Sequence, residues 1–368
     1  RGRHALKFGF ETRRSMNYEV NLSTGSGSFT FSTQPTGQPG NAGTGNGIAS
    51  LLLGFPTAFA QSQTQVLNRH SWYTAAFVQD DFTVSPSLTI NLGLRWETDS
   101  PITDANNRMN GFDANAINPV SGTSGVVKFM GVNGYSTQPY AIDLNNFGPR
   151  VGFAWQPFSS QKTVVRGGYG VFFAHPFDTG QPASANLGFS ISNTLNSTDN
   201  GITAPFYLSQ GVPAQNSSQT LDDSFGGVAV GKNPTTAVTY FDSKRRTGYS
   251  QQFNLGVQQQ LPNSILVEVT GIGNISHKLP NSNLSIDQIL PEILGPTHQS
   301  QKDRPFPQFS NVTILSPTIG DANYIAGMVR VEKRFSRGFS FVSSYTYSKF
   351  LDNSFEGGST LGKDNGHY

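Results

Sequence analysis

The stretch WYTAAFVQDDFTVSPSLTINLGLRWE, from Trp72 to Glu97, carries the pattern that decides the fold. From residue 88 onward, apolar and polar residues alternate without a break. The apolar set is Leu88, Ile90, Leu92, Leu94 and Trp96, and the polar set is Thr89, Asn91, Gly93, Arg95 and Glu97. Alternation with a period of two predicts a β-strand with one apolar and one polar face. The aromatic and β-branched residues before it favour a second strand, and Ser85-Pro86-Ser87 predicts a tight turn between the two.

Each arm of this predicted hairpin has about 9–11 residues, the length that a tilted strand needs to cross a bilayer. The same pattern recurs in seven further stretches, at about residues 4–13, 146–158, 163–173, 248–261, 265–273, 324–335 and 339–350. We therefore predict an all-β fold, a transmembrane antiparallel outer-membrane β-barrel, with nine strands in this chain. An open sheet would leave unpaired backbone groups in lipid, so we expect these strands to be part of a larger barrel.

Tight turns and long polar loops alternate along the chain. The loops cover about residues 15–65, 99–146, 175–247 and 276–322. Soluble domains rarely have several structureless loops longer than about 15 residues, whereas outer-membrane barrels combine short periplasmic turns with long extracellular loops. The same assignment places Trp96, Phe173 and Tyr347 at the outer strand ends and Phe82 and Phe335 at the inner ends, as expected for aromatic belts. The alternative, a β-sandwich with core aromatics, does not explain the loops.

Composition excludes several classes of protein. Only 13% of the 368 residues are charged, about half the usual share, and the chain has 40 Gly and 28 Phe, which suits a barrel wall but also a secreted β-sandwich or β-helix. The net charge of +2 lacks the electrostatic footprint of a nucleic-acid-binding protein. The absence of cysteine excludes a disulfide scaffold. No apolar run is long enough for a transmembrane helix, because the longest, residues 48–60, contains Gly54 and Pro56.

Several motifs together resemble one known family. They are AAFVQDDFTVSPSLTINLGLRWE, NFGPRVGFAWQPF, VVRGGYGVFF, YSQQFNLGVQQQLP, DRPFPQFSNV and VEKRFSRGFSFVSSYTYSK, with NRMNGFD at residues 107–113. In this order they resemble the barrel of Oar-like TonB-dependent transporters, over residues 4–349. The resemblance implies the outer membrane of a Gram-negative cell, a barrel of 22 strands, an N-terminal plug and a TonB box that couples uptake to the inner-membrane proton gradient.

Plug, TonB box and C-terminal strand have no counterpart in the sequence, which begins at Arg1 without a signal peptide. We therefore expect residues 1–368 to be an incomplete TonB-dependent transporter β-barrel domain, unable to pump alone. Members of the family are often associated with carbohydrate-like or unknown substrates, and the resemblance does not choose among them.

Candidate chemical motifs are weak. GGVAVGK (226–232) and GGSTLGK (357–363) fit part of a phosphate-binding loop, but Asn233 and Asp364 replace the hydroxyl residue that holds magnesium. The oxygen-rich cluster Asp104, Asn106, Asn107, Asn110 and Asp113 could hold calcium, but Gly111 is misplaced for an EF-hand, and a hydrogen-bonded Asx-rich loop fits better. The six His residues (4, 70, 175, 277, 298 and 367) are scattered and form no i, i+4 pair.

Charged residues of the strands follow the alternation. Lys7, Glu11, Arg95, Glu97, Arg150, Arg166 and Glu268 fall on the polar side, where we expect cross-strand ion pairs or contacts to a plug. Lys333 falls on the apolar side beside a turn, from which its ammonium can reach the headgroups. Asp80 and Asp81 are neighbours on a strand and so point to opposite faces. We expect them to bond turn amides at the periplasmic rim.

These patterns predict a transport protein rather than an enzyme. We predict no catalytic, cofactor-binding or metal-binding residues, no cofactor, and substrate-binding residues that the sequence does not define. The predicted partners are outer-membrane lipid, the plug of the full-length chain, the TonB system and an unidentified extracellular substrate, without nucleic acid. The alternative is a structural or adhesive surface β-barrel without energised transport.

Overall fold

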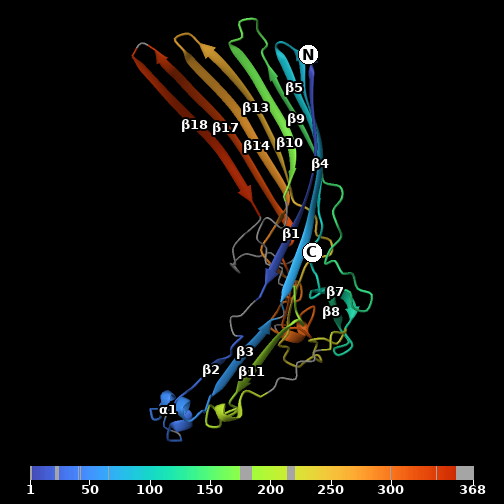
Figure 1. Cartoon of the computed structure of the whole chain (residues 1–368), viewed down its shortest axis with the longest axis vertical. Coiled ribbons are helices and arrows are strands. Elements are labelled where there is room, and N and C mark those ends of the chain that lie inside the picture. The colour runs from blue at the N-terminus through green and yellow to red at the C-terminus, as the bar shows by residue number, and fades with distance from the viewer. Residues whose placement is uncertain are drawn as a thin grey trace.

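The structure is a computed structural model that describes residues 2–20, 25–39, 41, 43–64, 66–174, 185–213, 220–298, 300–336 and 338–353. Its largest element is an antiparallel sheet (Figure 1) in the order β1-β4-β5-β9-β10-β13-β14-β17-β18. These nine strands are β1 (His4–Glu19), β4 (Leu67–Ser85), β5 (Leu88–Asp99), β9 (Phe147–Trp155), β10 (Thr163–Phe173), β13 (Tyr249–Leu261), β14 (Ile265–Pro280), β17 (Thr318–Ser336) and β18 (Phe339–Asp352). The short β6 (Thr103–Asp104) pairs with the outer part of β4. The prediction of nine long strands is confirmed.

Short turns join the strands at one end of this main sheet. In the β13–β14 turn, Asn263 and Ser264 both have positive φ, 61° and 63°. Left-handed backbone of this kind lets the chain reverse within the three residues between Leu261 and Ile265. Gly338, with φ of 86°, supplies left-handed backbone in the turn between β17 and β18. The sheet therefore has a turn end and a loop end, at the top and toward the bottom of Figure 1.

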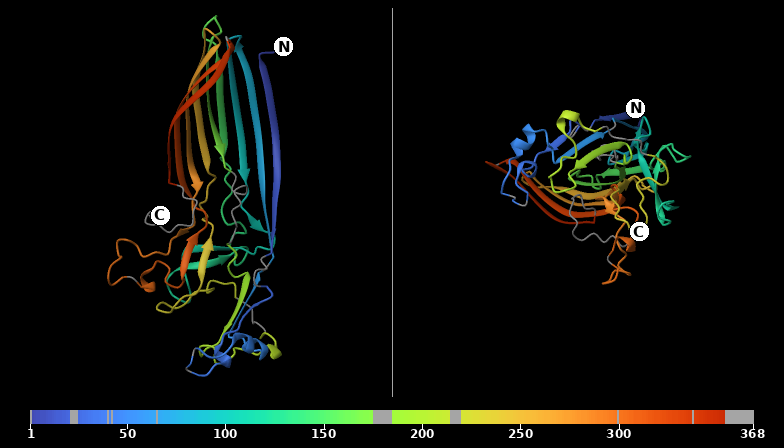
Figure 2. Two further views of the ribbon diagram at one scale, coloured as in Figure 1. Left: turned by 90° about the vertical axis from the view of Figure 1, so that its left-hand side faces the viewer. Right: turned by 90° about the horizontal axis from the view of Figure 1, so that it is seen from below.

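Strand register places the alternating residues on two continuous faces. Leu92 lies opposite Val151, and Asn91 lies opposite Asp81 and Gly152. The apolar face includes Leu6, Phe8, Leu92, Leu94, Val151, Tyr169, Phe253, Leu255, Val257, Val269, Ile325, Val329, Tyr345 and Tyr347, all of them exposed. Within the part of the chain that the structure describes, these side chains pack against no second sheet or helix, so the β-sandwich alternative is wrong. The sheet curves as an open arc whose edges are β1 and β18 (Figure 2).

The long loops fold into a separate body beyond the loop end, which we call the loop layer. It contains β2 (Ser28–Thr30), β3 (Ala58–Thr64), β7 (Asn110–Ile117), β8 (Ser124–Phe129), β11 (Ser190–Asn196), β12 (Ala237–Tyr240), β15 (Leu284–Ser285), β16 (Asn311–Ile314), α1 (Gly47–Leu52), η1 (Gln34–Thr36), η3 (Leu208–Gln210) and η4 (Gln301–Asp303). They form sheets ordered β11-β3-β2, β12-β16-β15 and β7-β8. The expectation of structureless loops was therefore wrong.

The buried apolar clusters of the described residues both lie in the loop layer. One joins Phe112, Val127, Phe129, Val238, Tyr240, Leu284, Phe306, Phe309, Val312 and Ile314. The other joins Ile102, Met109, Met130, Ala185, Phe241 and Leu315. Segments from three different long loops contribute to the first cluster, so burial of their apolar side chains holds these loops together.

Strand limits also differ from the predicted ones. β1 continues to Glu19, into the predicted first loop, and β4 begins at Leu67, before the predicted strand start at Trp72. Likewise, β17 begins at Thr318. Their outer halves mix polar residues into both faces, which weakens the alternation on which the prediction depended. Among the described helices, none has the length and apolar character to span a bilayer.

Candidate functional site

The candidate site is the polar face of the main sheet together with the loop layer that stands over its loop end. The polar face includes Lys7, Glu11, Asp81, Asn91, Arg95, Glu97, Arg150, Arg166, Gln252, Asn254, Gln258, Glu268, Arg330 and Ser344. Glycines such as Gly152, Gly168 and Gly256 lie between them and leave room beside the long side chains. All seven charged residues predicted for the polar side are on this face.

An ion cluster joins β1, β4 and β5 on the polar face. The Arg95 guanidinium donates to a Glu97 carboxylate oxygen at 2.8 Å and to the Tyr73 hydroxyl oxygen at 2.6 Å. It also reaches the Glu11 carboxylate at 3.2 Å, and the Tyr73 hydroxyl donates to Glu97 at 2.9 Å. Glu97 and Tyr73 are buried. The predicted cross-strand ion pair of Arg95 is confirmed, but the sequence gave no sign that Tyr73 completes it.

A second group of polar contacts lies nearer the turn end. Lys7 donates to Asp81 at 2.8 Å, and the same carboxylate accepts from the Asn91 amide at 2.7 Å. On the opposite, apolar face, the His4 ring pairs with Asp80 at 2.6 Å and stacks on Phe82 with 4.2 Å between ring centroids. The two aspartates point to opposite faces as predicted. The prediction that they bond turn amides was wrong, because neighbouring strands offer closer side-chain partners.

Arg330 of the polar face pairs with Glu332 at 2.9 Å. Three other charged residues of this face, Arg150, Arg166 and Glu268, have no ionic partner among the described residues. Arg166 is exposed and forms no ion pair there, and neither does Glu268. The Arg150 guanidinium lies over the Phe172 ring, 4.6 Å from its centroid. These groups can take a ligand or another protein segment on the polar side. Lys333 lies on the apolar face, as its register predicted. Its ammonium is buried and donates to the backbone and hydroxyl oxygens of Ser336 in the adjacent turn at 3.1 and 2.6 Å, instead of extending to the headgroups.

Two of the family-like motifs meet in the loop layer. The Phe112 ring, from NRMNGFD, lies edge-on to Phe306 from DRPFPQFSNV, with 5.0 Å between centroids. From the second motif, the buried Gln308 amide donates to the carbonyl oxygens of Ser124 and Gly125 at 2.7 and 2.8 Å. A Cβ on Gly125, whose φ is 105°, would lie 2.5 Å from the Phe306 ring. The motifs therefore build the core of the loop layer.

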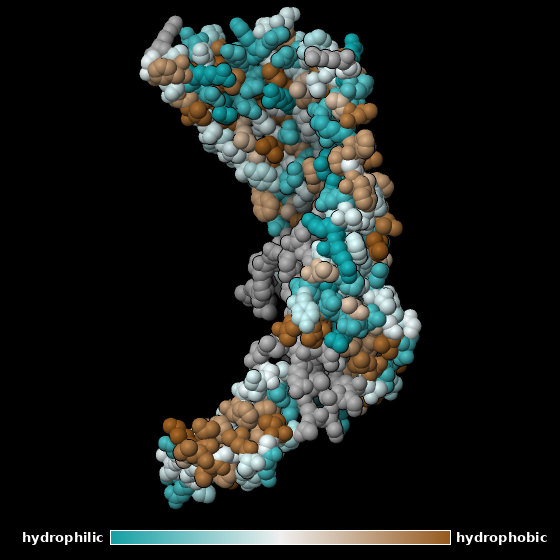
Figure 3. Space-filling view, viewed as in Figure 1, coloured by the Kyte–Doolittle hydropathy of each residue, from teal (hydrophilic) through white to brown (hydrophobic). Residues whose placement is uncertain are grey.

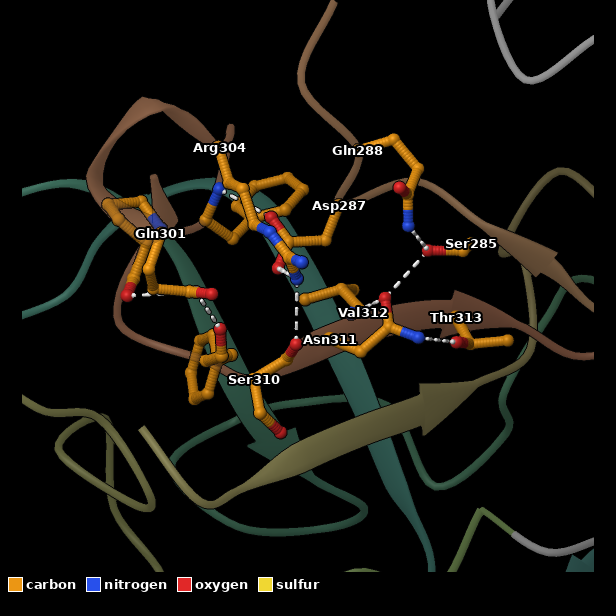
Figure 4. A network of polar contacts seen from close by, with 12 residues as sticks. Ser285, Asp287, Gln288, Gln301, Arg304, Ser310, Asn311, Val312 and Thr313 are labelled. Carbon is orange, nitrogen blue, oxygen red and sulfur yellow. Dashed lines mark hydrogen bonds and ion pairs between the residues drawn. The ribbon is translucent and has the colours of Figure 1, made fainter. Parts of the chain in front are cut away.

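A buried carboxyl group joins this core to its neighbouring segment (Figure 4). Asp287 is fully buried, and its Oδ1 accepts from the backbone N–H of Phe306 at 2.9 Å. Its Oδ2 has no hydrogen-bond partner among the described residues. The Arg304 guanidinium nitrogen lies 3.9 Å from Oδ2 and donates instead to the Ser310 carbonyl oxygen at 2.9 Å. Burial raises the pKa of Asp287 to about 6, against the weaker opposing effects of the Phe306 N–H and the Arg304 charge.

Polar contacts fasten the loop layer to the loop end of the main sheet. Trp96 donates from its indole nitrogen to the Leu144 carbonyl oxygen at 2.8 Å. The buried Asp143 carboxylate accepts from the backbone N–H of Thr247 at 3.1 Å, and the Asn146 amide donates to the Thr247 hydroxyl at 3.2 Å. These bonds connect the second and third long loops at the point where their strands leave the sheet.

The weaker candidate motifs have structural explanations. Asp104 accepts from the backbone N–H groups of Asn106 and Arg108 at 2.9 and 3.1 Å and also from Asn68 at 2.7 Å, so the hydrogen-bonded Asx-rich loop is confirmed. Asn110 instead bonds Thr239 and Leu187. Residues 226–232 form turns with no helix after them, unlike a phosphate-binding loop. Residues 357–363 lie outside the described residues. Within the described residues, no group of three His, Asp or Glu side chains could hold a metal.

A family model described as an outer membrane beta barrel domain matches residues 1–367. The chain belongs to this family. An outer membrane beta barrel domain resides in the outer membrane of a Gram-negative cell, so hydrocarbon surrounds the apolar face of the sheet. Because such barrels have short periplasmic turns and long extracellular loops, the turn end is periplasmic and the loop layer extracellular.

Solved structures with a similar fold are larger proteins. The FrpB iron transporter from Neisseria meningitidis (F3-3 variant) has 9% identity and a TM-score of 0.42, covering 95% of this chain and 33% of that one. The alcaligin outer membrane receptor FauA from Bordetella pertussis has 11% identity and a TM-score of 0.34, and the match covers 80% of this chain and 35% of FauA. The siderophore receptor PirA from Pseudomonas aeruginosa has 12% identity and a TM-score of 0.36, and the match covers 81% of this chain and 42% of PirA. This barrel domain thus spans about a third of FrpB and FauA. No curated protein matches the sequence.

Proposed function

We propose that this chain is part of the wall of a TonB-dependent transporter, with a loop layer that receives an extracellular substrate. The observation that carries the proposal is the polar face of an open arc, which no described strand or helix covers. Nine strands do not close the sheet, and its edges β1 and β18 would expose backbone groups to lipid. Further strands must therefore pair with both edges, and the completed barrel is wide.

A wide barrel needs something inside it. Small barrels fill their interior with side chains, whereas barrels of about 16 or more strands leave a channel or a plugged lumen. The polar face here is lined mainly by hydrophilic and glycine residues, with a few apolar ones such as Phe172, and these do not fill such a space. Arg166 and Glu268, which have no ionic partner among the described residues, lie where a plug domain would meet the wall. In this proposal the plug of the full-length chain closes the lumen and the TonB system opens it.

The substrate is not defined by the polar face. Arg150 and Arg166 favour an anionic group, and the uncharged amides of Gln252 and Asn254 favour hydroxyl-rich ligands. The alternative function, a structural or adhesive barrel without energised uptake, is supported by the extent to which the loop layer is folded and packed.

Conductance of the full-length protein in a planar bilayer distinguishes the two. A plugged transporter should conduct few ions in buffer and should open when a denaturant unfolds the plug without melting the barrel. A barrel that conducts steadily before denaturant is added would contradict the proposal.

A paired cysteine experiment in the full-length protein locates the plug. Residues 1–368 contain no native cysteine, and any cysteine elsewhere is replaced by serine. Arg166→Cys, on the polar face, should react with a water-soluble thiol reagent only after the denaturant has displaced the plug. Val165→Cys, one residue away on the lipid side, should stay unreactive under both conditions. Equal reactivity of Arg166→Cys before and after denaturant would remove the support for a plug at this wall.

A further inference from the structure

The part of the loop layer farthest from the main sheet differs from the rest in charge. We call it the distal arm; it comprises β2, β3, β11, α1 and the segment that follows β11 to residue 213 (Figure 1). No Asp, Glu, Lys, Arg or His occurs between Glu19 and Arg69. In residues 186–213 the one charged group is Asp199, whose carboxylate accepts from the Ser197 hydroxyl at 2.7 Å and the Thr203 N–H at 2.8 Å. The distal arm is therefore almost free of charge.

An aromatic core holds the arm together and leaves its tip apolar. Phe59 is buried, with the Phe29 and Phe206 rings at 4.8 and 5.6 Å from its own. At the tip, the exposed fraction is 82% for Leu52, and Ile48, Leu51 and Leu53 are also exposed. Leu208 joins them, because its N–H bonds the Gly54 carbonyl oxygen at 3.0 Å. Figure 3 shows this apolar surface as the brown patch at the lower left.

The arm also has an unprotected strand edge. β11 pairs with β3 on one side, and no described strand pairs with its other side. Its sequence, SISNTLN, contains neither a charged residue nor a proline, the usual devices that prevent an edge strand from pairing with another chain. The unpaired N–H and C=O groups of this edge need hydrogen-bond partners wherever they are removed from water.

We propose that the distal arm binds the distal arm of a second copy of this chain, through the apolar tip and the β11 edge. A two-fold contact brings each residue near its own counterpart, so like charges would oppose it and an uncharged surface suits it. An antiparallel partner strand satisfies the β11 edge, whereas the acyl layer of a membrane offers no donors or acceptors to it. The arm lies on the extracellular side, so two copies meet above the membrane. This proposal does not depend on transport.

Disulfide cross-linking in outer membranes tests the proposal with the full-length protein, any cysteine elsewhere in it being replaced by serine. Leu52→Cys, at the tip, should form disulfide-linked dimers under mild oxidation. The matched control is Ile293→Cys, in the loop layer outside the arm, where the exposed fraction of Ile293 is 46%. At equal surface abundance we expect at least ten-fold more dimer for Leu52→Cys. Equal yields for the two variants would overturn the proposal.

Two added charges separate association from folding. In the Leu52→Cys background, Leu51→Glu at the tip and Thr194→Lys on the exposed side of β11 should each lower the dimer yield several-fold, with unchanged heat-modifiable mobility and protease pattern. If both leave the yield unchanged, the arm does not self-associate.

A fluorophore on Leu52→Cys distinguishes a lipid partner. Its emission should shift to the blue with protein density in the membrane, and a shift caused only by added phosphatidylcholine vesicles would overturn the proposal.

Discussion

The main sheet and the loop layer bury their apolar residues in opposite ways. In the sheet, side chains such as Leu255 and Val269 are exposed on the protein surface, and the buried residues include the ion-paired Glu97. In the loop layer, Phe309 and Val312 have no exposed surface and form an ordinary hydrophobic core. One chain therefore folds in two solvents, with hydrocarbon around the first region and water around the second. A leucine side chain therefore stabilises the main sheet by contacting lipid on its surface, and it stabilises the loop layer by packing inside its core.

The largest effect expected from this difference is a failure of barrel assembly. Leu92→Arg places a charge in lipid, which costs about 2–4 kcal/mol, and loses a leucine contact with hydrocarbon of about 2 kcal/mol. Heat-modifiable mobility in outer-membrane fractions should show no folded barrel. Asn91→Arg, one residue away on the polar face, should assemble. Equal tolerance of the two substitutions would contradict the assigned register.

The counterpart in the loop layer is Phe309→Ala. Removing a fully buried phenylalanine costs about 3–5 kcal/mol, and we expect this loss to unfold the loop layer while the barrel still assembles. Limited proteolysis of intact cells should then cleave the extracellular loops rapidly. Ile293→Ala, at an exposed site, serves as the control. If Phe309→Ala prevented assembly of the barrel, the two regions would not be independent folding units.

A smaller effect concerns pH. Because the pKa of Asp287 in the folded protein, about 6, lies above its unfolded value near 4, this group contributes stability that is complete below about pH 4 and lost as the pH rises through 6. At pH 7 the loss is on the order of 2–3 kcal/mol. Asp287→Asn keeps an acceptor for Phe306 and removes the charge, so hydrogen exchange in residues 285–311 should be slower than in the wild type at pH 7 and similar at pH 4. Unchanged exchange at pH 7 would argue against a buried charge.

The smallest effect is expected on the polar face near the turn end. Lys7 and Asp81 form an ion pair with side-chain exposures of 61% and 27%, and exposed pairs of this kind contribute less than about 1 kcal/mol. Lys7→Met should therefore leave urea unfolding of the barrel nearly unchanged. A large loss of stability would show that the polar face is shielded from water, for instance by a closely packed plug.

The difference between the two regions also explains what the sequence predicts. The sheet meets a different solvent on each side, so Leu92 and Asn91 must alternate and the nine strands are visible as a pattern. The register then follows, and with it the polar side of Arg95, whose expected cross-strand ion pair forms with Glu11. The contribution of Tyr73 is not visible, because an aromatic residue in a strand fits the apolar interpretation equally well.

The loop layer has no such regularity. Its strands are as short as β15, with two residues, and its defining contacts join distant segments, such as Asn110 to Thr239 and Gln308 to Gly125. Local sequence patterns do not report contacts at such separations. Asp287 illustrates the same limit, since a single aspartate in a polar loop looks solvated until the fold buries it.

The length of the β1–β4 pair has a consequence for what the cell presents to its surroundings. β4 has 19 residues, which at about 3.3 Å per residue and a tilt of about 40° rise roughly 45 Å along the membrane normal, against an apolar band of about 25 Å. The part of this strand pair that exceeds the apolar band extends out of the membrane and holds the distal arm above the headgroup zone. Antibodies, phages and neighbouring cells would reach that arm before any other part of this chain.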